Sequence, residues 1–356
     1  MTDDGPVRWF AELALDDRAA VGGKGASLGE LTRAGLPVPP GFVIPTPLFE
    51  SFLSAADPAR DLRRAVAALD HRDAGAIAAT CRDVRNRLRR TPVPLPVRDA
   101  VTGAYGQLAR GGGCPVAVRS SATCEDSDDA SFAGLQDTYL WVLSADDLID
   151  RVRDCWASLY NDESVTYRLR LGIPEADVSI AVVVQQMIDA ECAGVMFTRS
   201  PTTGDKSVIL VEGSWGLGSC LVGGEVTPDR FVINKVTGEV NRRDVSEKAT
   251  EHIPDRDAGG VREVAVDAAR RQQSCLDDDR LAVLWRLGRD VEQHYGAPQD
   301  IEWAMPRASA GDEPVYLLQS RPETVWANRE RAPKAAPAER NYDHLVNMMS
   351  ARSRKT

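Results

Sequence analysis

The stretch VGGKGASLGEL, residues 21–31, places three glycines around one lysine and continues directly into apolar positions with helical spacing. It differs from the common Gly-Lys phosphate loop, G-x-x-x-x-G-K-[ST], which would need glycine where Arg18 stands and Ser or Thr where Gly25 stands. The apolar spacing predicts a helix over residues 26–34. On these residues alone, the stretch is either a nucleotide site of another kind or a turn that precedes a helix.

The bulk composition bounds the class of protein. The chain has 356 residues, of which 43% are hydrophobic and 27% charged, the balance of an ordinary globular protein of roughly two or three domains. A net charge of −10 without a long basic stripe argues against nucleic acid as the main partner. No apolar run reaches the roughly 18 residues of a membrane span, and the acidic start lacks a signal peptide. We therefore expect a cytoplasmic protein with no membrane partner.

The cysteines point to a reducing compartment. Seven are scattered along the chain, and no pair has the C-x-x-C spacing of a zinc or redox site. We interpret them as free thiols.

The order of predicted elements indicates an α/β or α+β fold. Residues 48–110 read as amphipathic helices. Strands are predicted at 114–121, 178–188, 193–200 and 206–218, in QDIEWAM (299–305) and in PVYLLQSRPE (314–323). Residues 231–240 read as a hairpin with its turn near Thr237–Gly238, and 260–295 as a long helical region.

We expect three parts along the chain. Residues 1–195 form an N-terminal subdomain that includes the helical insert 48–110, and residues 196–326 form a second subdomain. Residues 327–356, rich in Ala, Pro and Arg, read as a mobile basic tail.

Arg119 ends the predicted strand in CPVAVRSS and precedes the polar loop SATCEDSDDASFAG. A guanidinium at a strand end can bind a phosphate through two hydrogen bonds, and hydroxyl-rich loops suit anions. The alternative is a surface loop with Arg119 in an ordinary ion pair.

Glu302 and Gln319 lie inside apolar strand candidates, and Arg321 follows Gln319 by two residues. A buried carboxylate needs a metal, a cation or a hydrogen-bonded neighbour. Oxygen ligands on adjacent strands suit Mg²⁺, which takes one or two protein oxygens together with substrate phosphates. The alternative that fits the spacing equally well is a buried Glu302–Arg321 ion pair.

Two further segments carry weaker signals. Gln185, Gln186 and Met187 end a buried strand, where backbone groups could face an adenine edge and Met187 could pack on the ring; a plain core role fits as well. The glycine-rich segment 212–229 suits close approach to a phosphate or to a partner surface. The four histidines have no triad-like or metal-like neighbours in the sequence, so each is interpreted as structural or solvated.

Taken in order, five segments form one pattern. VGGKGASLGELTRAGLPVPPGFVIPT, VAVRSSATCEDSDDASFAGLQDTY, GVMFTRSPTTGD, EGSWGLGSCLVGGEVTPD and IEWA…LLQSRPET resemble the ATP-binding domain of the phosphoenolpyruvate synthase, pyruvate phosphate dikinase and rifampin phosphotransferase family. The resemblance covers about residues 8–326.

The resemblance implies an ATP-grasp-type fold, with two subdomains and ATP·Mg²⁺ held in the cleft between them. It implies phosphate contacts and catalytic roles for Lys24, Arg119 and Arg321, and Mg²⁺ ligands at Glu302 and Gln319. The nucleotide-contacting set that it implies is Lys24, Arg119, Gly134, Thr138, Gln185, Gln186, Met187, Glu302, Gln319 and Arg321.

One family feature is not matched. In the family, ATP phosphorylates a histidine on a swivelling domain within a Thr/Ser-Ser-His segment, and no histidine here follows Ser or Thr. We therefore expect the ATP-binding subunit of a split enzyme, similar to that of phenylphosphate synthase, with the histidine domain and the substrate-binding subunit on other chains. AMP is the implied product. The alternatives are a self-contained small-molecule kinase and an ATP-binding regulatory module without turnover.

Overall fold

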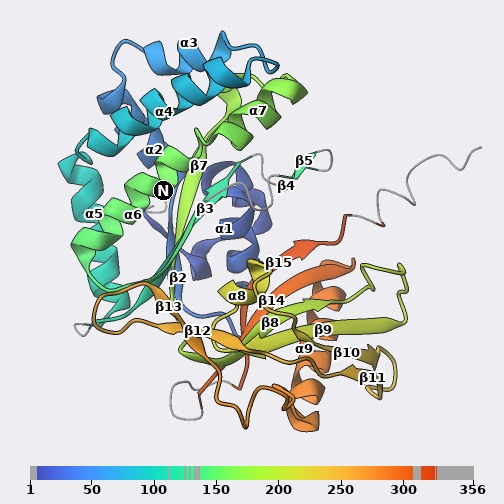
Figure 1. The fold of residues 1–356 in the computed structure, drawn as a ribbon. Coiled ribbons are helices and arrows are strands. Elements are labelled where there is room, and N and C mark those ends of the chain that lie inside the picture. Colours follow the sequence, from blue (N-terminus) through green and yellow to red (C-terminus); the bar gives the residue numbers. More distant parts are fainter. Residues whose placement is uncertain are drawn as a thin grey trace, which may run out of the picture.

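The computed structural model describes residues 6–110, 113–123, 126–127, 130–131, 137–307, 314–324 and 326. Two large antiparallel sheets form the two halves of the molecule (Figure 1). The first carries most of the helices on one face, and the second lies below it with one long helix. Among the described residues, no helix combines the length and apolarity that a membrane crossing requires.

The first sheet has the strand order β1-β2-β7-β3-β6. Its strands are β1 (Arg8–Trp9), β2 (Gly41–Ile44), β3 (Val116–Ala122), β6 (Thr138–Val142) and β7 (Ile180–Gln186). Successive strand residues point to opposite faces. In β7, Val182 and Val184 join the core under the helical layer, whereas Ala181 and Val183 pack on the opposite side. Because both faces are covered, residues 180–184 of β7 are all apolar.

The helical layer confirms the prediction for residues 48–110. Its helices are α2 (Thr46–Ala56), α3 (Asp61–Ala67), α4 (Ala74–Arg90), α5 (Leu95–Leu108), α6 (Ala145–Ser158) and α7 (Asp162–Leu171). Phe52 stacks on Trp156 at the centre of this core, with ring centroids 4.7 Å apart. On the other face, α1 (Arg18–Arg33) contacts β2, β3 and β7 of the first sheet and also β15 of the second.

The glycine-rich opening stretch is helical in the structure, which corrects the expectation of a non-helical segment before a helix over residues 26–34. The helix begins at Arg18 instead of residue 26 and is broken only at Gly22, where φ is 70° and ψ is 175°. Residues 23–33 then continue as a regular helix. The sequence pattern misses this start because glycines are poor helix formers, and tertiary packing overrides that propensity.

The second sheet has the order β11-β10-β9-β8-β14-β15. Its strands are β8 (Ala190–Phe197), β9 (Val208–Trp215), β10 (Asp229–Asn234), β11 (Val240–Asp244), β14 (Gln299–Pro306) and β15 (Tyr316–Pro322). Helix α9 (Asp278–Tyr295) covers one face, with Leu281, Leu284 and Val291 in the shared core. The predicted hairpin is confirmed as β10 and β11, with Gly238 in its turn at φ 79°.

The predicted helical region 260–295 is wrong in its first half. Residues 261–265 form strand β13, which pairs with β12 (Thr250–Pro254), and the helix starts only at Asp278. The segment VREVA contains two β-branched residues, Val261 and Val264, which favour a strand. Asp277 caps α9 by accepting a hydrogen bond from the Arg280 amide at 2.8 Å, so the helix begins there.

The change from one sheet to the other occurs after β7. β8 begins at Ala190 and pairs only with strands of the second sheet. The predicted boundary after residue 195 therefore lies inside β8, and we propose a division near residues 187–189.

Candidate functional site

A cavity of about 260 Å³ lies where the two sheets meet. It is lined from the first sheet by Ala117, Arg119, Thr138, Leu140 and Gln185–Ile188, and from the second by Ala190, Ala193, Gly194, Leu217–Ser219, Val222, Glu302–Ala304 and Leu318. Most of this lining is apolar, with a few polar side chains, which is the composition of small-molecule sites. The volume is just below the roughly 300–1,000 Å³ of typical ligand pockets, so a larger ligand would extend beyond it.

Arg119 crosses the gap between the sheets. Its Nη2 donates to Glu302 Oε2 at 2.8 Å and to Gln319 Oε1 at 2.6 Å, and its Nη1 donates to the Leu318 carbonyl at 3.1 Å. The carbonyl is available because of a bulge: Glu302 pairs with Gln319 and Trp303 with Leu317, which leaves Leu318 as the extra residue. One cation of the first sheet therefore gathers three oxygens of the second.

Glu302 and Gln319 are neighbours across the β14–β15 ladder, and both direct an oxygen to the same guanidinium nitrogen. The alternative of a Glu302–Arg321 ion pair is wrong. Arg321 instead lies opposite Asp300 and approaches it at 3.4 Å.

Asp300 is a partly buried carboxylate two residues before Glu302 on β14. Burial raises the pKa of Asp300 to about 6; Arg321 opposes that rise, and the Glu323 charge adds to it. Asp300 Oδ1 is buried without a hydrogen-bond partner among the described residues. Carboxylates and arginines thus converge on one end of the cavity without fully satisfying one another.

The kink at Gly22 is held by Ser121 of β3. Ser121 Oγ donates to the Val21 carbonyl at 2.9 Å and accepts from the Gly25 amide at 3.3 Å. A Cβ at residue 22 would lie 2.3 Å from two Ser121 oxygens, so only glycine fits this contact. Two segments almost a hundred residues apart in the chain therefore form one unit, which starts a helix with Lys24 in its first turn.

Lys24 is half-buried and does not line the cavity. Its positive charge opposes the rise in pKa that burial and nearby carboxylates cause at the Cys155 thiol. The helix is also tied to the second sheet, since Ser27 Oγ donates to the Ser320 carbonyl at 2.6 Å. Helix N-termini attract anions, so Lys24 and this helix start offer positive potential at the junction of the sheets.

The predicted adenine side lies at the end of β7. The side chain of Gln185 is almost completely buried, and Gln185, Gln186 and Met187 all line the cavity. The Gln186 and Met187 amides donate at 2.9 Å to the carbonyls of Pro40 and Pro115. These two amides therefore hold the strand end in place. A ligand there must form its hydrogen bonds with other groups of the segment.

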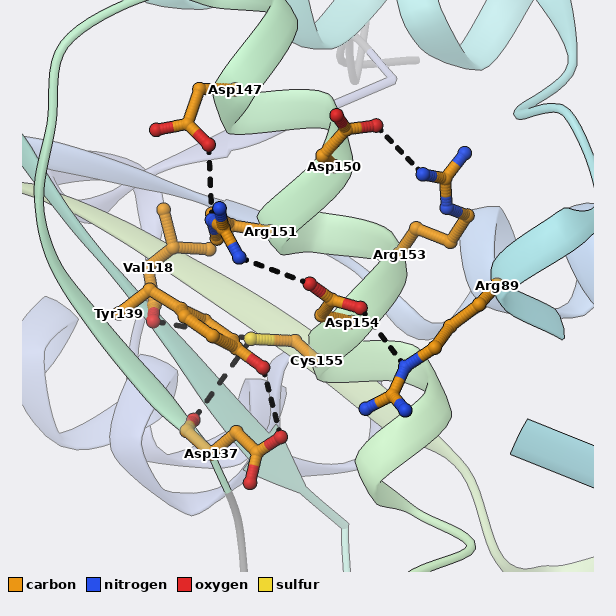
Figure 2. A network of polar contacts seen from close by, with 10 residues as sticks. All are labelled: Arg89, Val118, Asp137, Tyr139, Asp147, Asp150, Arg151, Arg153, Asp154 and Cys155. Carbon is orange, nitrogen blue, oxygen red and sulfur yellow. Dashed lines mark hydrogen bonds and ion pairs between the residues drawn. The ribbon is translucent and has the colours of Figure 1, made fainter. Parts of the chain in front are cut away.

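Thr138 pairs with Arg119 and is backed by a polar network (Figure 2). The Tyr139 hydroxyl donates to Asp137 Oδ2 at 2.9 Å, and burial together with that carboxylate raises the pKa of Tyr139. Arg151 lies over the Tyr139 ring and bridges Asp147 and Asp154 on α6. The network fixes β6 to α6 and so fixes the edge of the cavity.

Comparison with known proteins matches this geometry to one family. The model of the pyruvate phosphate dikinase AMP/ATP-binding domain matches residues 18–342. The chain belongs to this family. It is an α+β protein of the ATP-grasp type, as the sequence predicted.

The relatives are named as synthases. The chain is 42% identical over 322 residues to a probable phosphoenolpyruvate synthase of Methanothermobacter thermautotrophicus, covering 90% of this chain and 46% of the relative. It is 36% identical over 332 residues to that of Methanocaldococcus jannaschii, covering 92% and 27%. It is 34% identical over 374 residues to phosphoenolpyruvate synthase of Pyrococcus furiosus, covering 94% and 45%. The chain thus spans less than half the length of these relatives.

Within this dikinase-type domain, the structure brings most of the predicted set together. Arg119, Thr138, Gln185–Met187 and Glu302 line the cavity, and Gln319 reaches it through Arg119. Lys24 and Arg321 are not among the lining residues, and Gly134 lies outside the described residues.

Sequence reasoning missed Ser121 and Asp300. Both stand in quoted motifs, VRSSA and QDIEW, two residues from a predicted site residue on the same strand. Residues two apart on a strand lie on the same face, so Ser121 shares a face with Arg119 and Asp300 shares one with Glu302.

Proposed function

We propose that this chain binds ATP·Mg²⁺ between its two sheets and transfers phosphoryl groups from it. The observation that carries the proposal is the convergence of Arg119, Glu302 and Gln319 from opposite sheets on one point of the cavity wall. Phosphoryl transfer depends on positioning and charge neutralisation more than on a protein nucleophile. The family's description as an AMP/ATP-binding domain supports the choice of nucleotide.

The donor set fits Mg²⁺. A carboxylate and an amide oxygen, Glu302 Oε2 and Gln319 Oε1, both lie within 2.8 Å of one cationic nitrogen, so they already surround a positive charge. Among the described residues, no group of three or more His, Cys, Asp or Glu could hold a metal without help. Mg²⁺ commonly takes one or two protein oxygens and completes its shell with phosphates and water. When bound, it would neutralise phosphate charge.

The arginines and the lysine would hold the phosphates. In the structure Arg119 supplies the positive charge that Glu302 and Gln319 require, and incoming phosphates would compete for its guanidinium. Arg321 and the helix start at Lys24 add positive potential on either side. At the other end, Gln185–Met187 and the apolar lining suit the base.

The phosphoryl acceptor would come from another domain or chain. His71 lies beside Asp70 at 3.6 Å, His294 contacts Glu30 of α1 at 2.8 Å, and neither lines the cavity. His252 contacts Glu225 and is also absent from the cavity lining. His344 lies outside the described residues. We therefore propose a histidine on a partner domain as acceptor of one phosphoryl group and water as acceptor of the other, which leaves as inorganic phosphate. AMP is then the product, and the histidine passes its phosphoryl group to a small molecule.

The test is nucleotide product analysis. The purified chain is incubated with ATP and Mg²⁺, alone and with the isolated phosphohistidine domain of a phosphoenolpyruvate synthase relative, and the products are separated by ion-exchange chromatography. We expect ATP binding without turnover by the chain alone, and AMP with acid-labile protein phosphate when the domain is added.

Other products would select the alternatives. Rapid ADP release with phosphorylation of a small acceptor by the chain alone would favour a self-contained kinase. Tight ATP binding with no product under any condition would favour a regulatory module.

A further inference from the structure

Ser219 begins the short helix α8 (Ser219–Val222) and is one of the residues that line the cavity. The preceding Gly218 lies over Ala193, since a Cβ built on it would be 3.5 Å from the Ala193 Cβ. Ala193 pairs with Ala304, two residues along β14 from Glu302. The start of α8 therefore lies over the sheet between the level of Glu302 and that of Ala190, which follows the Gln185–Met187 segment.

The Ser219 hydroxyl is oriented by two further side chains. Ser219 Oγ lies 2.8 Å from His252 Nδ1, and His252 Nε2 lies 2.9 Å from Glu225 Oε2. The three residues come from the start of α8, from β12 and from the segment before β10. In this Ser–His–Glu relay only Ser219 lines the cavity, and the proposed function above assigns it no role.

The relay fixes which partner donates. The Glu225 carboxylate only accepts, so His252 carries its proton on Nε2 and leaves Nδ1 as an acceptor. Ser219 then donates its hydroxyl proton to Nδ1, and both of its lone pairs remain available. Ser219 thus presents an acceptor oxygen to the cavity, which suits a ligand that offers a hydroxyl donor.

The backbone around the relay holds it in place. The Leu217 amide donates to the His252 carbonyl at 2.8 Å, and Gly216 forms a bridge with the same residue. At the far end of the β12–β13 hairpin, the Gly260 amide donates to the Trp141 carbonyl of β6 at 3.0 Å. The hairpin that carries His252 is therefore attached to both halves of the molecule.

We propose that Ser219 accepts a hydrogen bond from a ribose hydroxyl of the bound nucleotide, with His252 and Glu225 as positioning residues. Phosphates at Arg119 and a base at Gln185–Met187 leave the sugar between them, over the part of the sheet where α8 starts. The inference rests on the proposed nucleotide site and deepens it, because it assigns the discrimination between ribonucleotides and deoxyribonucleotides to a named contact.

The experiment measures Mg²⁺-dependent affinity for ATP, 2′-deoxyATP and 3′-deoxyATP by isothermal titration calorimetry. We expect the unaltered chain to bind one of the deoxynucleotides about five- to tenfold more weakly than ATP, as for the loss of one buried hydrogen bond. Ser219→Ala should weaken ATP by the same factor and leave that deoxynucleotide unchanged, so their affinity ratio falls to about one.

Variants of the relay separate positioning from folding. His252→Ala should reduce the affinity ratio strongly, and His252→Asn, whose amide can still meet Ser219, should retain part of it. Glu225→Gln should have the smallest effect, since Glu225 is half-exposed. Ser54→Ala and His71→Gln, on the helical layer, serve as matched controls that should keep the full ratio.

The outcomes are distinguishable. If ATP does not bind, the proposed function and this inference both fall. If ATP binds but the unaltered chain shows no preference over either deoxynucleotide, the inference alone is wrong. It is equally wrong if Ser219→Ala lowers the melting temperature while the affinity ratio stays unchanged, because Ser219 then serves only to anchor the hairpin.

Discussion

Two polar regions at the cavity, around Arg119 and around Ser219, are built on opposite electrostatic principles. Where Arg119 crosses between the sheets, charges are left incompletely paired: Arg119 Nε and Asp300 Oδ1 are buried without partners among the described residues. At Ser219 and His252, a chain of polar contacts satisfies each member in turn. The Arg119 region leaves charged atoms available to a charged ligand, whereas the Ser219 region presents one oriented oxygen.

The difference between the Arg119 region and the Ser219 region indicates which groups of a ligand each region would bind. Unsatisfied buried charge costs free energy until a partner arrives, so the Arg119 region favours a ligand that brings both phosphate and metal. A satisfied relay costs little when empty and contributes selectivity more than affinity. The predictions that follow test this contrast, from the largest effect to the smallest.

Glu302→Gln should have the largest effect. The substitution keeps the shape and one oxygen but removes the negative charge, and we expect Mg²⁺-dependent turnover with the partner domain to fall at least about 100-fold. Glu292→Gln, which removes a carboxylate paired with Lys235 on the far side of the second sheet, is the control and should keep full activity. Persistence of metal-dependent turnover in Glu302→Gln would show that the metal is held elsewhere.

Gly22→Ala should weaken the fold where the kink meets Ser121. The residue has φ 70° and ψ 175°, a region nearly reserved for glycine, and the added methyl would meet Ser121 oxygens at 2.3 Å. We expect the free energy of unfolding to fall by about 2–3 kcal/mol in urea titrations.

Gly35→Ala is the matched control for Gly22→Ala. Its φ is 72°, but no atom lies within 4 Å of the added Cβ, so only the backbone term of about 1 kcal/mol applies. Equal losses for the two variants would mean that the Ser121 contact contributes nothing.

Asp300→Asn should change how stability depends on pH. Because burial raises the pKa of Asp300 from 3.8 to about 6, the folded state holds this proton more tightly than the unfolded state. Its contribution is fully present below pH 4 and is lost as the pH rises through 6.

The measurement is the free energy of unfolding at pH 4 and pH 7 without nucleotide. Relative to Asp300→Asn, the unaltered chain should lose about 1–2 kcal/mol more stability over this interval. Asp150→Asn, an exposed carboxylate on α6, should show no such difference. Parallel pH profiles for all three proteins would show that folding does not raise the pKa of Asp300.

The sequence predicted the Arg119 region better than the Ser219 region for a physical reason. Arg119, Glu302 and Gln319 each lie on a strand whose apolar neighbours mark a polar side chain as exceptional. Ser219 and His252 lie in segments with no such background, and only tertiary folding brings them to 2.8 Å. His252 was interpreted as structural or solvated because its neighbours in sequence are uninformative.

The elements of the fold were likewise predictable where the local sequence pattern determines them. The alternation and apolar content of β7, β9 and β10 made them predictable, whereas the early start of α1 depends on a contact with Ser121 that local propensity cannot anticipate. β13 was missed because Val261 and Val264 are three residues apart, a spacing that also fits a helix, and a genuine helix follows from Asp278.

The most direct test of the central claim is ATP affinity in the presence of Mg²⁺ for the unaltered chain and for Arg119→Ala. Arg230→Ala, an exposed arginine paired with Glu212 on the second sheet, is the control. We predict that the unaltered chain reaches its full affinity for ATP only when Mg²⁺ is present. Arg119→Ala should weaken ATP binding at least about 30-fold, and the control should not weaken it. Equal affinity in Arg119→Ala and the unaltered chain would contradict the placement of the nucleotide between the two sheets.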